Sequence, residues 1–161
     1  MPLVAGQLQL GPVRCAWRPY GKGERAEPLA RQWLAAELDT SPGALTIQRT
    51  AQGRPILGAP HADWDASWSH SGEGLLMALA KGLRVGIDLE LKRPRPKAQV
   101  LADRFFAPEE AAILAALPDE DRERAFVRLW CAKEAMLKAH GQGISFGLHR
   151  LVFALEGDDW R

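Results

Sequence analysis

The sequence has little cysteine and no long hydrophobic run. Cys15 and Cys131 lie far apart and belong to no CxxC or Cys/His ligand spacing, which excludes a disulfide framework and argues against a zinc site. The longest purely apolar run covers residues 75–80, whereas a membrane-spanning helix needs about 20 residues. The first residues also lack the basic start and apolar block of a signal peptide. We therefore expect a cytoplasmic protein in a reducing compartment, with no membrane partner.

An excess of charge of one sign is also missing. The chain has 21 basic and 20 acidic side chains, so its net charge is +1 and no overall field attracts nucleic acid. With 47% hydrophobic and 25% charged residues, the 161-residue chain has the composition of a globular protein of about one domain. We expect no nucleic-acid partner.

Strand patterns dominate the first part of the chain. Residues 7–17 alternate apolar and polar side chains and predict a strand, and Pro28 then falls in the first turn of a predicted helix that ends before Thr40. Short apolar runs bounded by Gly, Pro or Asp predict further strands at 45–48, 64–69, 75–80 and 85–89.

Helical patterns dominate after a basic, proline-broken connector at residues 92–97. We predict helices over 98–105, from Pro108 onward, and over 119–140, where Gly141 offers a left-handed cap. Residues 148–155 predict a final strand. The connector is the only plausible internal boundary.

Two carboxylates end the predicted strand at 85–89. Residues two apart on a strand point to the same side, so Asp88 and Glu90 would project together and repel each other. A divalent cation relieves that repulsion, and Mg²⁺ accepts one or two protein carboxylates alongside water or substrate phosphates. The alternative is that the pair simply marks a strand leaving the core.

The long predicted helix carries Lys133, Glu134 and Lys138 close to its apolar face. Lys133 falls inside the apolar arc, where a lysine must reach solvent or find an anion. Glu134 and Lys138 are one turn apart, and their alternative interpretation is an ordinary helix-surface ion pair. For Cys131 we favour a small packed hydrophobic side chain.

His70 lies between Ser69 and Ser71 and before Gly72. This arrangement can present hydroxyl, imidazole and backbone N–H groups to a phosphate. A nucleophilic triad is the competing interpretation, but the G-x-S-x-G turn is missing.

The order of these motifs is more specific than any one of them. The sequence contains GRP at 53–55, WSHSG at 68–72, VGIDLE at 85–90, RFFAPEE at 104–110 and LWCAKEAMLKAHGQGI at 129–144. In this order they resemble the 4′-phosphopantetheinyl transferase superfamily, in particular its larger, pseudodimeric, surfactin-synthetase-activating class. The resemblance covers about residues 53–153.

The resemblance implies a reaction and a metal. The phosphopantetheine arm of coenzyme A would pass to a serine of an apo acyl or peptidyl carrier protein, releasing 3′,5′-ADP. Asp88 and Glu90 would hold Mg²⁺ against the pyrophosphate, and Glu134 would complete the metal shell or deprotonate the serine. Charge neutralisation and a nearby base are what phosphoryl transfer requires.

The resemblance also implies contacts with coenzyme A. Lys138 would stabilise charge on the departing ADP, and His70 would contact a phosphate, with Ser69 and Ser71 beside it. Arg54 stands where the family usually has lysine, and it keeps the charge. The coenzyme A contacts predicted from the sequence are Arg54, Ser69, His70, Ser71 and Lys133. For the 3′-phosphate, Arg25 and Arg31 are candidates.

The implied fold is α+β, with two similar halves at residues 1–90 and 91–161 forming one pseudodimeric, monomeric unit. The family continues past Leu155 with further strands, so the second half is either shortened or independent of them. The carrier would dock near the helices after Phe105. Two other functions stay open, a Mg²⁺-dependent phosphohydrolase and a non-catalytic module that binds coenzyme A or a carrier.

Overall fold

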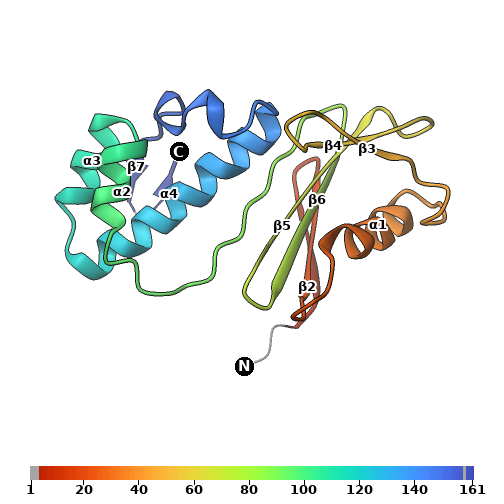
Figure 1. The fold of residues 1–161 in the computed structure, drawn as a ribbon, viewed down its shortest axis with the longest axis horizontal. Helices are drawn as coiled ribbons and strands as arrows, with labels where there is room; N and C mark the ends of the chain where they lie inside the picture. Colours follow the sequence, from red (N-terminus) through yellow and green to blue (C-terminus); the bar gives the residue numbers. More distant parts are fainter. Residues whose placement is uncertain (1–3, 158) are drawn as a thin grey trace.

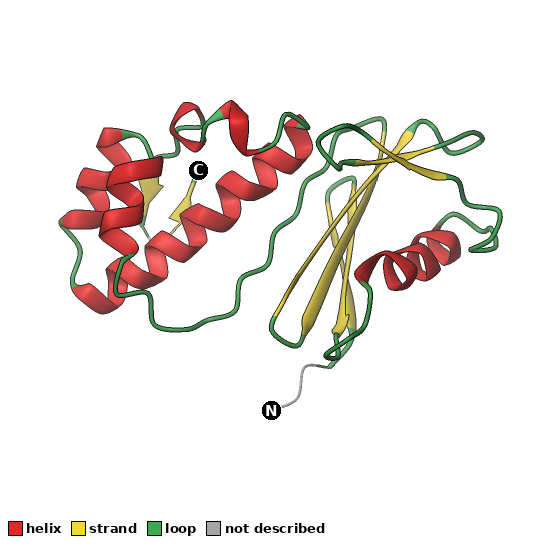
Figure 2. Cartoon of the chain, viewed as in Figure 1, coloured by secondary structure: helices red, strands yellow, loops and turns green. Residues whose placement is uncertain are grey.

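The computed structural model describes residues 4–157 and 159–161 and has two parts. A β-rich part formed by the first half of the chain lies beside a mainly helical part, and an extended stretch joins them (Figures 1 and 2). The C-terminal end of the long helix α4 reaches the β-rich part (Figure 1). The structure is thus the mixture of helices and antiparallel sheets that the sequence predicts.

The first part is built on a four-stranded antiparallel sheet in the order β1-β2-β6-β5. A second, two-stranded sheet pairs β3 with β4. The predicted single strand at 7–17 is wrong, because Gly11 adopts a φ of +55° and turns the chain into a hairpin. The elements are β1 (Gly6–Leu10), β2 (Val13–Pro19), α1 (Ala26–Glu37), β3 (Ile47–Arg49), β4 (Pro55–Leu57), β5 (Trp64–Ser71) and β6 (Gly74–Lys81).

The two faces of this sheet differ in side-chain size. Helix α1 packs its buried Ala30 and Leu34 against one face, where the large side chains of Leu75 and Leu79 of β6 lie. The opposite face carries small side chains, which leave room for another segment of chain to approach closely. These small residues are Cys15, Ser67, Ala78 and Ala80.

Residues 85–91, which we call the 85–91 segment, cover that second face. Val85 and Ile87 pack with Cys15, Ala78 and Ala80. The segment is extended but forms no strand, so the predicted strand at 85–89 is wrong. It runs between the sheet and helix α4 (Figure 1).

The helices of the second part are α2 (Ala98–Phe105), α3 (Pro108–Ala115) and α4 (Asp119–His140), which confirms the predicted bounds of α2 and α4 and the predicted start of α3. Pro108 begins α3, and the Glu110 carboxylate accepts the Ala107 N–H before it. Gly141 has a φ of +84° and is the left-handed cap predicted for α4. These helices enclose a core that contains Leu114, Phe126 and Leu129.

After α4 the chain curls instead of forming the predicted strand at 148–155. It makes two short 3₁₀ turns, Ile144–Phe146 and Leu148–Arg150, followed by the two-residue strands β7 (Leu155–Glu156) and β8 (Asp159–Trp160). The ammonium group of Lys133 binds the carbonyl oxygens of Leu148 and Leu151, so the backbone bends around a buried cation and cannot extend.

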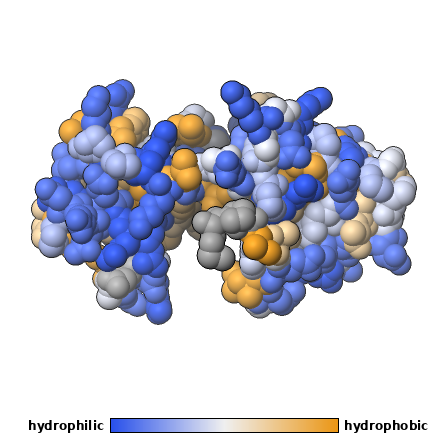
Figure 3. Space-filling model, turned by 90° about the horizontal axis from the view of Figure 1, so that it is seen from below, coloured by the Kyte–Doolittle hydropathy of each residue, from blue (hydrophilic) through white to orange (hydrophobic). Residues whose placement is uncertain are grey.

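The face of the molecule that is seen from below is mostly hydrophilic (Figure 3). Seen from below, polar side chains cover most of both parts, and hydrophobic ones form only small groups (Figure 3). Within residues 4–157 and 159–161, no helix combines the length and the apolar character that crossing a bilayer requires.

Candidate active site

Alternate polar residues of β5 hold the 85–91 segment through their side chains. Their partners lie 19 or 20 residues further along the chain, so the segment follows the direction of β5. The bonds are Val85 N to Asp65 Oδ2 (2.6 Å), Ile87 N to Ser67 Oγ (3.2 Å), Ser69 Oγ to Asp88 Oδ1 (2.9 Å) and Leu91 N to Ser71 Oγ (2.8 Å). Side chains thus replace the main-chain ladder of an ordinary strand pair.

Gly86 brings the 85–91 segment against α4. A Cβ atom at this position would overlap the carbonyl oxygen of Ala135 and lie 2.6 Å from the nitrogen of Ala139. Only glycine permits this approach of two main chains. This contact determines which turn of α4 the next residues of the 85–91 segment lie against.

Asp88 and Lys138 meet at this crossing. The ammonium group of Lys138 lies 2.7 Å from Asp88 Oδ1 and also donates to the carbonyl oxygen of Ile87 at 3.1 Å. The Asp88 side chain is only 8% exposed, so water screens the pair weakly. The VGIDLE motif and helix α4, which lie far apart in the sequence, are therefore joined by one ion pair.

The second oxygen of Asp88 is buried and has no hydrogen-bond partner. A buried carboxylate oxygen without a donor is costly, because it has lost water and gained nothing. An oxygen of this kind suits a hard cation such as Mg²⁺, so the donor chemistry at Asp88 fits the implied metal. Within the described residues no three His, Cys, Asp or Glu side chains are already grouped as metal ligands.

Glu134 of α4 lies near Asp88 of the 85–91 segment. Burial raises the pKa of the Glu134 carboxyl, and the negative charges of Asp88 and Glu90 raise it further, whereas Lys138 lowers it. Asp88 and Glu90 therefore lie close enough to Glu134 for their negative charges to raise its pKa. Cys131, one turn before, has its pKa raised to about 12 by burial and by Asp88.

Glu90 is turned toward the connector. Its carboxylate lies 2.6 Å from the guanidinium of Arg95, and the backbone N–H of Arg95 donates to Glu123 of α4. The Arg95 guanidinium thus holds the Glu90 carboxylate at the connector.

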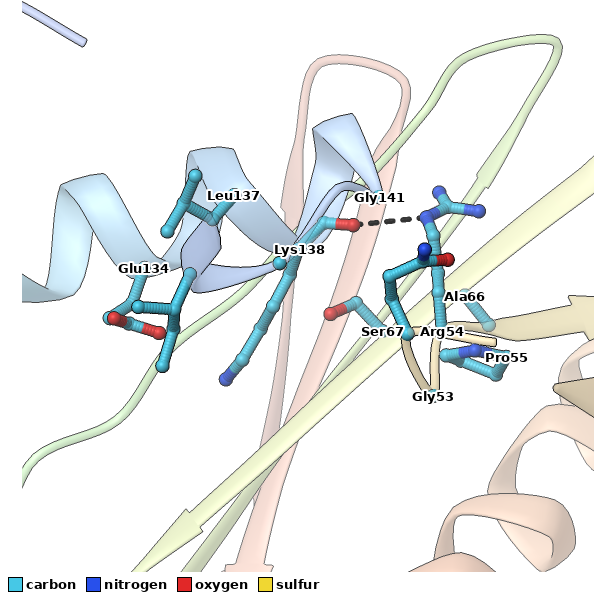
Figure 4. Close-up of a pocket in the computed structure, with 12 residues that line it drawn as sticks. Gly53, Arg54, Pro55, Ala66, Ser67, Glu134, Leu137, Lys138 and Gly141 are labelled. Atoms are coloured by element: carbon cyan, nitrogen blue, oxygen red, sulfur yellow. Dashed lines mark hydrogen bonds between the residues drawn. The ribbon is translucent and has the colours of Figure 1, made fainter. Parts of the chain in front are cut away.

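A cavity of about 210 Å³ lies where the GRP turn, β5 and the end of α4 meet. Figure 4 shows Glu134 and Lys138 on the helix side and Arg54 and Ser67 on the sheet side. Arg54 donates to the carbonyl oxygen of Lys138 at 2.9 Å and pairs with Asp65. The walls of the cavity are formed by residues 52–55, Ala66, Ser67, Glu134, Leu137, Lys138, Gly141, Gly143 and Ile144.

The predicted coenzyme A contacts of the WSHSG motif separate in the structure. Ser69 and Ser71 point to the 85–91 segment and hold it. His70 points to the opposite side of β5, where its exposed ring lies 4.7 Å from the ring of Tyr20. The structure therefore does not bring His70 together with the cavity.

Lys133 requires a correction. It is completely buried and lies 2.7 Å from the equally buried carboxylate of Glu110. Because Lys133 pairs with an anion inside the protein, it is not available to contact coenzyme A, and that prediction is wrong. Arg31 is also engaged elsewhere, because it binds the carbonyl oxygens of Pro42 and Leu45 and pairs with Glu27.

Sequence reasoning missed Asp65 and Ser67, and it placed Arg95 among basic residues that could attract a carrier and not as the partner of Glu90. A signal for the first two was present, because β5 alternates polar residues with Trp64, Ala66 and Trp68, which face α1. Such alternation indicates two different faces. No local pattern indicates that Arg95 turns back to Glu90.

Comparison with known proteins identifies the family. The family model of the 4′-phosphopantetheinyl transferase superfamily matches residues 84–159. The 4′-phosphopantetheinyl transferase AcpT of Salmonella typhimurium is 37% identical over 139 residues, which are 86% of this chain and 69% of AcpT. The 4′-phosphopantetheinyl transferase HetI of Nostoc sp. is 40% identical over 119 residues, 73% of this chain and 50% of HetI.

The human L-aminoadipate-semialdehyde dehydrogenase-phosphopantetheinyl transferase is 30% identical over 138 residues, 79% of this chain and 44% of the human protein. The chain thus spans about half the length of several curated relatives that it matches. It belongs to the 4′-phosphopantetheinyl transferase superfamily.

Proposed function

We propose that the protein transfers the 4′-phosphopantetheine arm of coenzyme A to a serine hydroxyl of an apo carrier protein and releases 3′,5′-ADP. The observation that carries the proposal is the ion pair between Lys138 and the buried Asp88 carboxylate, which joins the VGIDLE and KEAMLK motifs beside the cavity. Membership of the superfamily supports the same reaction.

Arg54 and Lys138 supply positive charge at the cavity for the phosphates of coenzyme A. Only two of the five guanidinium N–H groups of Arg54 are needed for its bonds to Asp65 and to the Lys138 carbonyl. The cavity is smaller than the sites that enclose drug-sized ligands, which measure about 300–1,000 Å³, so coenzyme A would extend beyond it. His70, exposed at the edge of the sheet, is accessible to a phosphate group there.

Glu134 is the proposed base. It would accept the proton of the carrier serine as the serine oxygen bonds to the β-phosphorus of coenzyme A and the bond to the ADP oxygen breaks. A carboxyl with a raised pKa accepts a proton more readily near neutral pH than an ordinary one. Lys138 would stabilise the negative charge that the ADP gains.

Asp88 would hold Mg²⁺ through its unpartnered oxygen, with Glu90 as a further ligand, and Glu134 would complete the metal shell where it does not act as the base. Bound Mg²⁺ neutralises charge on pyrophosphate oxygens. Glu90 must leave Arg95 to join that site, since its carboxylate is occupied by the guanidinium.

We further propose the pseudodimeric arrangement, with similar halves at residues 1–90 and 91–161, in a cytoplasmic monomer. The carrier would dock near α2 and α3. Of the basic groups that could attract an acidic carrier, Arg122 and Arg128 already pair with Asp119 and Asp159. The exposed Lys92 and Arg93 of the connector are therefore the better candidates.

One assay tests the reaction. The protein is incubated with coenzyme A, Mg²⁺ and an apo acyl carrier protein, and the carrier mass and released 3′,5′-ADP are measured. Transfer gives both, whereas ADP without a mass gain indicates hydrolysis and binding without either indicates a non-catalytic module. Asp88→Asn and addition of EDTA should each abolish transfer. Asp63→Asn is the control, because this exposed carboxylate pairs with Lys81 of β6, away from the cavity and from the proposed docking helices.

A further inference from the structure

Asp65 occupies a central position that neither the motifs nor the proposed reaction uses. It lies on β5 opposite Ala80 of β6, and its side chain is 16% exposed. One oxygen, Oδ2, accepts hydrogen bonds from two different segments of the chain. These donors are the guanidinium of Arg54 and the backbone N–H of Val85, the latter at 2.6 Å.

The first bond orients Arg54. While one nitrogen of the guanidinium pairs with Asp65, Nε donates to the carbonyl oxygen of Lys138 at 2.9 Å. A planar guanidinium held at two points has a fixed direction. Asp65 therefore orients the Arg54 side chain at the wall of the cavity. Arg54 in turn links the GRP turn to the end of α4.

The second bond fixes the start of the 85–91 segment. Val85 is the first residue of the VGIDLE motif, and its N–H has no strand partner because the segment forms no ladder. Asp88 comes three residues later. One oxygen atom therefore binds both Arg54 and the first residue of the segment that carries Asp88.

The chemistry requires a carboxylate at this position. A cationic donor and a backbone donor converge on the same oxygen, and a charged acceptor forms stronger bonds to both. An amide has nearly the same shape but lacks the charge that balances Arg54. Asparagine would fill the space of Asp65 without holding the guanidinium.

We infer that Asp65 is a positioning residue of this site, which sets Arg54 and the 85–91 segment in the relation that coenzyme A binding and transfer need. The inference rests on the proposed function. Asp65 would not touch the reacting atoms.

The test compares Asp65→Asn with Asp63→Asn. Asp63 lies two residues earlier and forms an exposed pair with Lys81, so the same chemical change there leaves Arg54 and Val85 in place. We expect Asp65→Asn to weaken coenzyme A binding at least fivefold in calorimetry and to lower kcat/KM at least tenfold. Asp63→Asn should stay within twofold of the wild type. Asp65→Glu, which keeps the charge, should recover part of the affinity.

A readout independent of activity is the NMR signal of the Arg54 Nε–H group and of the Val85 amide. Both should exchange with solvent faster in Asp65→Asn than in Asp63→Asn, at equal thermal stability. Unchanged exchange and equal coenzyme A affinity in the two variants would overturn the inference. If the wild type fails to bind coenzyme A or to modify a carrier, the proposed function fails, while the exchange measurement still decides whether Asp65 positions Arg54.

Discussion

Gly86 and Ala135 meet main chain to main chain where the 85–91 segment crosses α4. A methyl group on Gly86 would overlap the carbonyl oxygen of Ala135, an atom that cannot move without breaking the helix. The small side chains of Ala135 and Ala139 leave the helix open at this crossing. Together with the serines of β5, this contact places the residues that follow Gly86 in the motif, including Asp88.

Gly86→Ala should therefore destabilise the protein by about 3 kcal/mol or more, since overpacking against backbone has no room to relax. Transfer activity should fall with it, because Asp88 is pushed away from Lys138. Urea unfolding measures the first effect. Gly43→Ala is the matched control, because a Cβ there meets nothing within 4 Å. Equal stability of the two variants would refute the close approach.

Glu134→Gln should abolish transfer while coenzyme A binding is largely kept. If Glu134 is the base, it works only when ionised, so kcat of the wild type should fall as the pH drops through its raised pKa. That acidic limb should lie above the range of an ordinary glutamate. A pH–rate profile measures it, and unchanged turnover of the variant would exclude Glu134 as base.

Although Glu134→Gln should abolish activity, it should increase the stability of the fold at neutral pH. A carboxyl whose pKa is raised by folding binds protons more tightly in the folded state, so stability is lost as the pH rises through the folded pKa. Glu134→Gln removes this loss and should make the protein more stable than the wild type at pH 7. The gain should vanish at pH 4. Unfolding curves at the two pH values provide the measurement.

Cys131 should be chemically inert in the folded protein. With its pKa raised to about 12 by burial and by Asp88, its thiolate fraction at pH 8 is roughly a thousandth of that of a free cysteine with a pKa of about 8.5. Alkylation by iodoacetamide, followed residue by residue with mass spectrometry, should be correspondingly slow and become fast in urea. Asp88→Asn should increase the native rate, and rapid native alkylation would contradict the buried placement.

Lys133→Met should destabilise the protein by about 3–5 kcal/mol, because it leaves the Glu110 carboxylate buried without its cation. The double variant Lys133→Met/Glu110→Gln should be more stable than the single one, since the remaining amide carries no charge. Urea unfolding of both variants measures the difference. A Lys133→Met protein of normal stability that has lost coenzyme A affinity would return Lys133 to the binding site.

The positions of the helices of the second part could be predicted from sequence, because Pro108 marks the start of α3 and Gly141 marks the end of α4. The structure of residues 85–89 could not be predicted in this way. Apolar and other residues alternate there as in a strand, but the backbone N–H groups of Val85 and Ile87 bind side chains and not a neighbouring main chain. Apolar alternation reports which residues are buried and not which atoms complete the hydrogen bonds. The strand predicted after α4 failed for a related reason, since a lysine distant in sequence takes its carbonyl oxygens.

The site was predicted in part. Lys138 and Glu134 line the cavity with Arg54, and Asp88 lies against Lys138. The family resemblance was sufficient for these residues, because its motifs name them on separate elements that meet in the fold. It was insufficient for Lys133, because an apolar arc on a helix does not say which neighbouring element supplies the counterion. It was also insufficient for Glu90, whose partner Arg95 follows a proline-broken connector of no regular period.

The side-chain ladder on β5 makes the placement of the VGIDLE motif adjustable in small steps. Two strands joined through their main chains shift only by a register of residues, and such a shift rebuilds the whole pairing. A segment fastened by one aspartate and three serines can be raised, lowered or tilted by exchanging a single side chain. Evolution or a protein engineer could thus tune the distance between Asp88 and α4 while the sheet beneath stays the same.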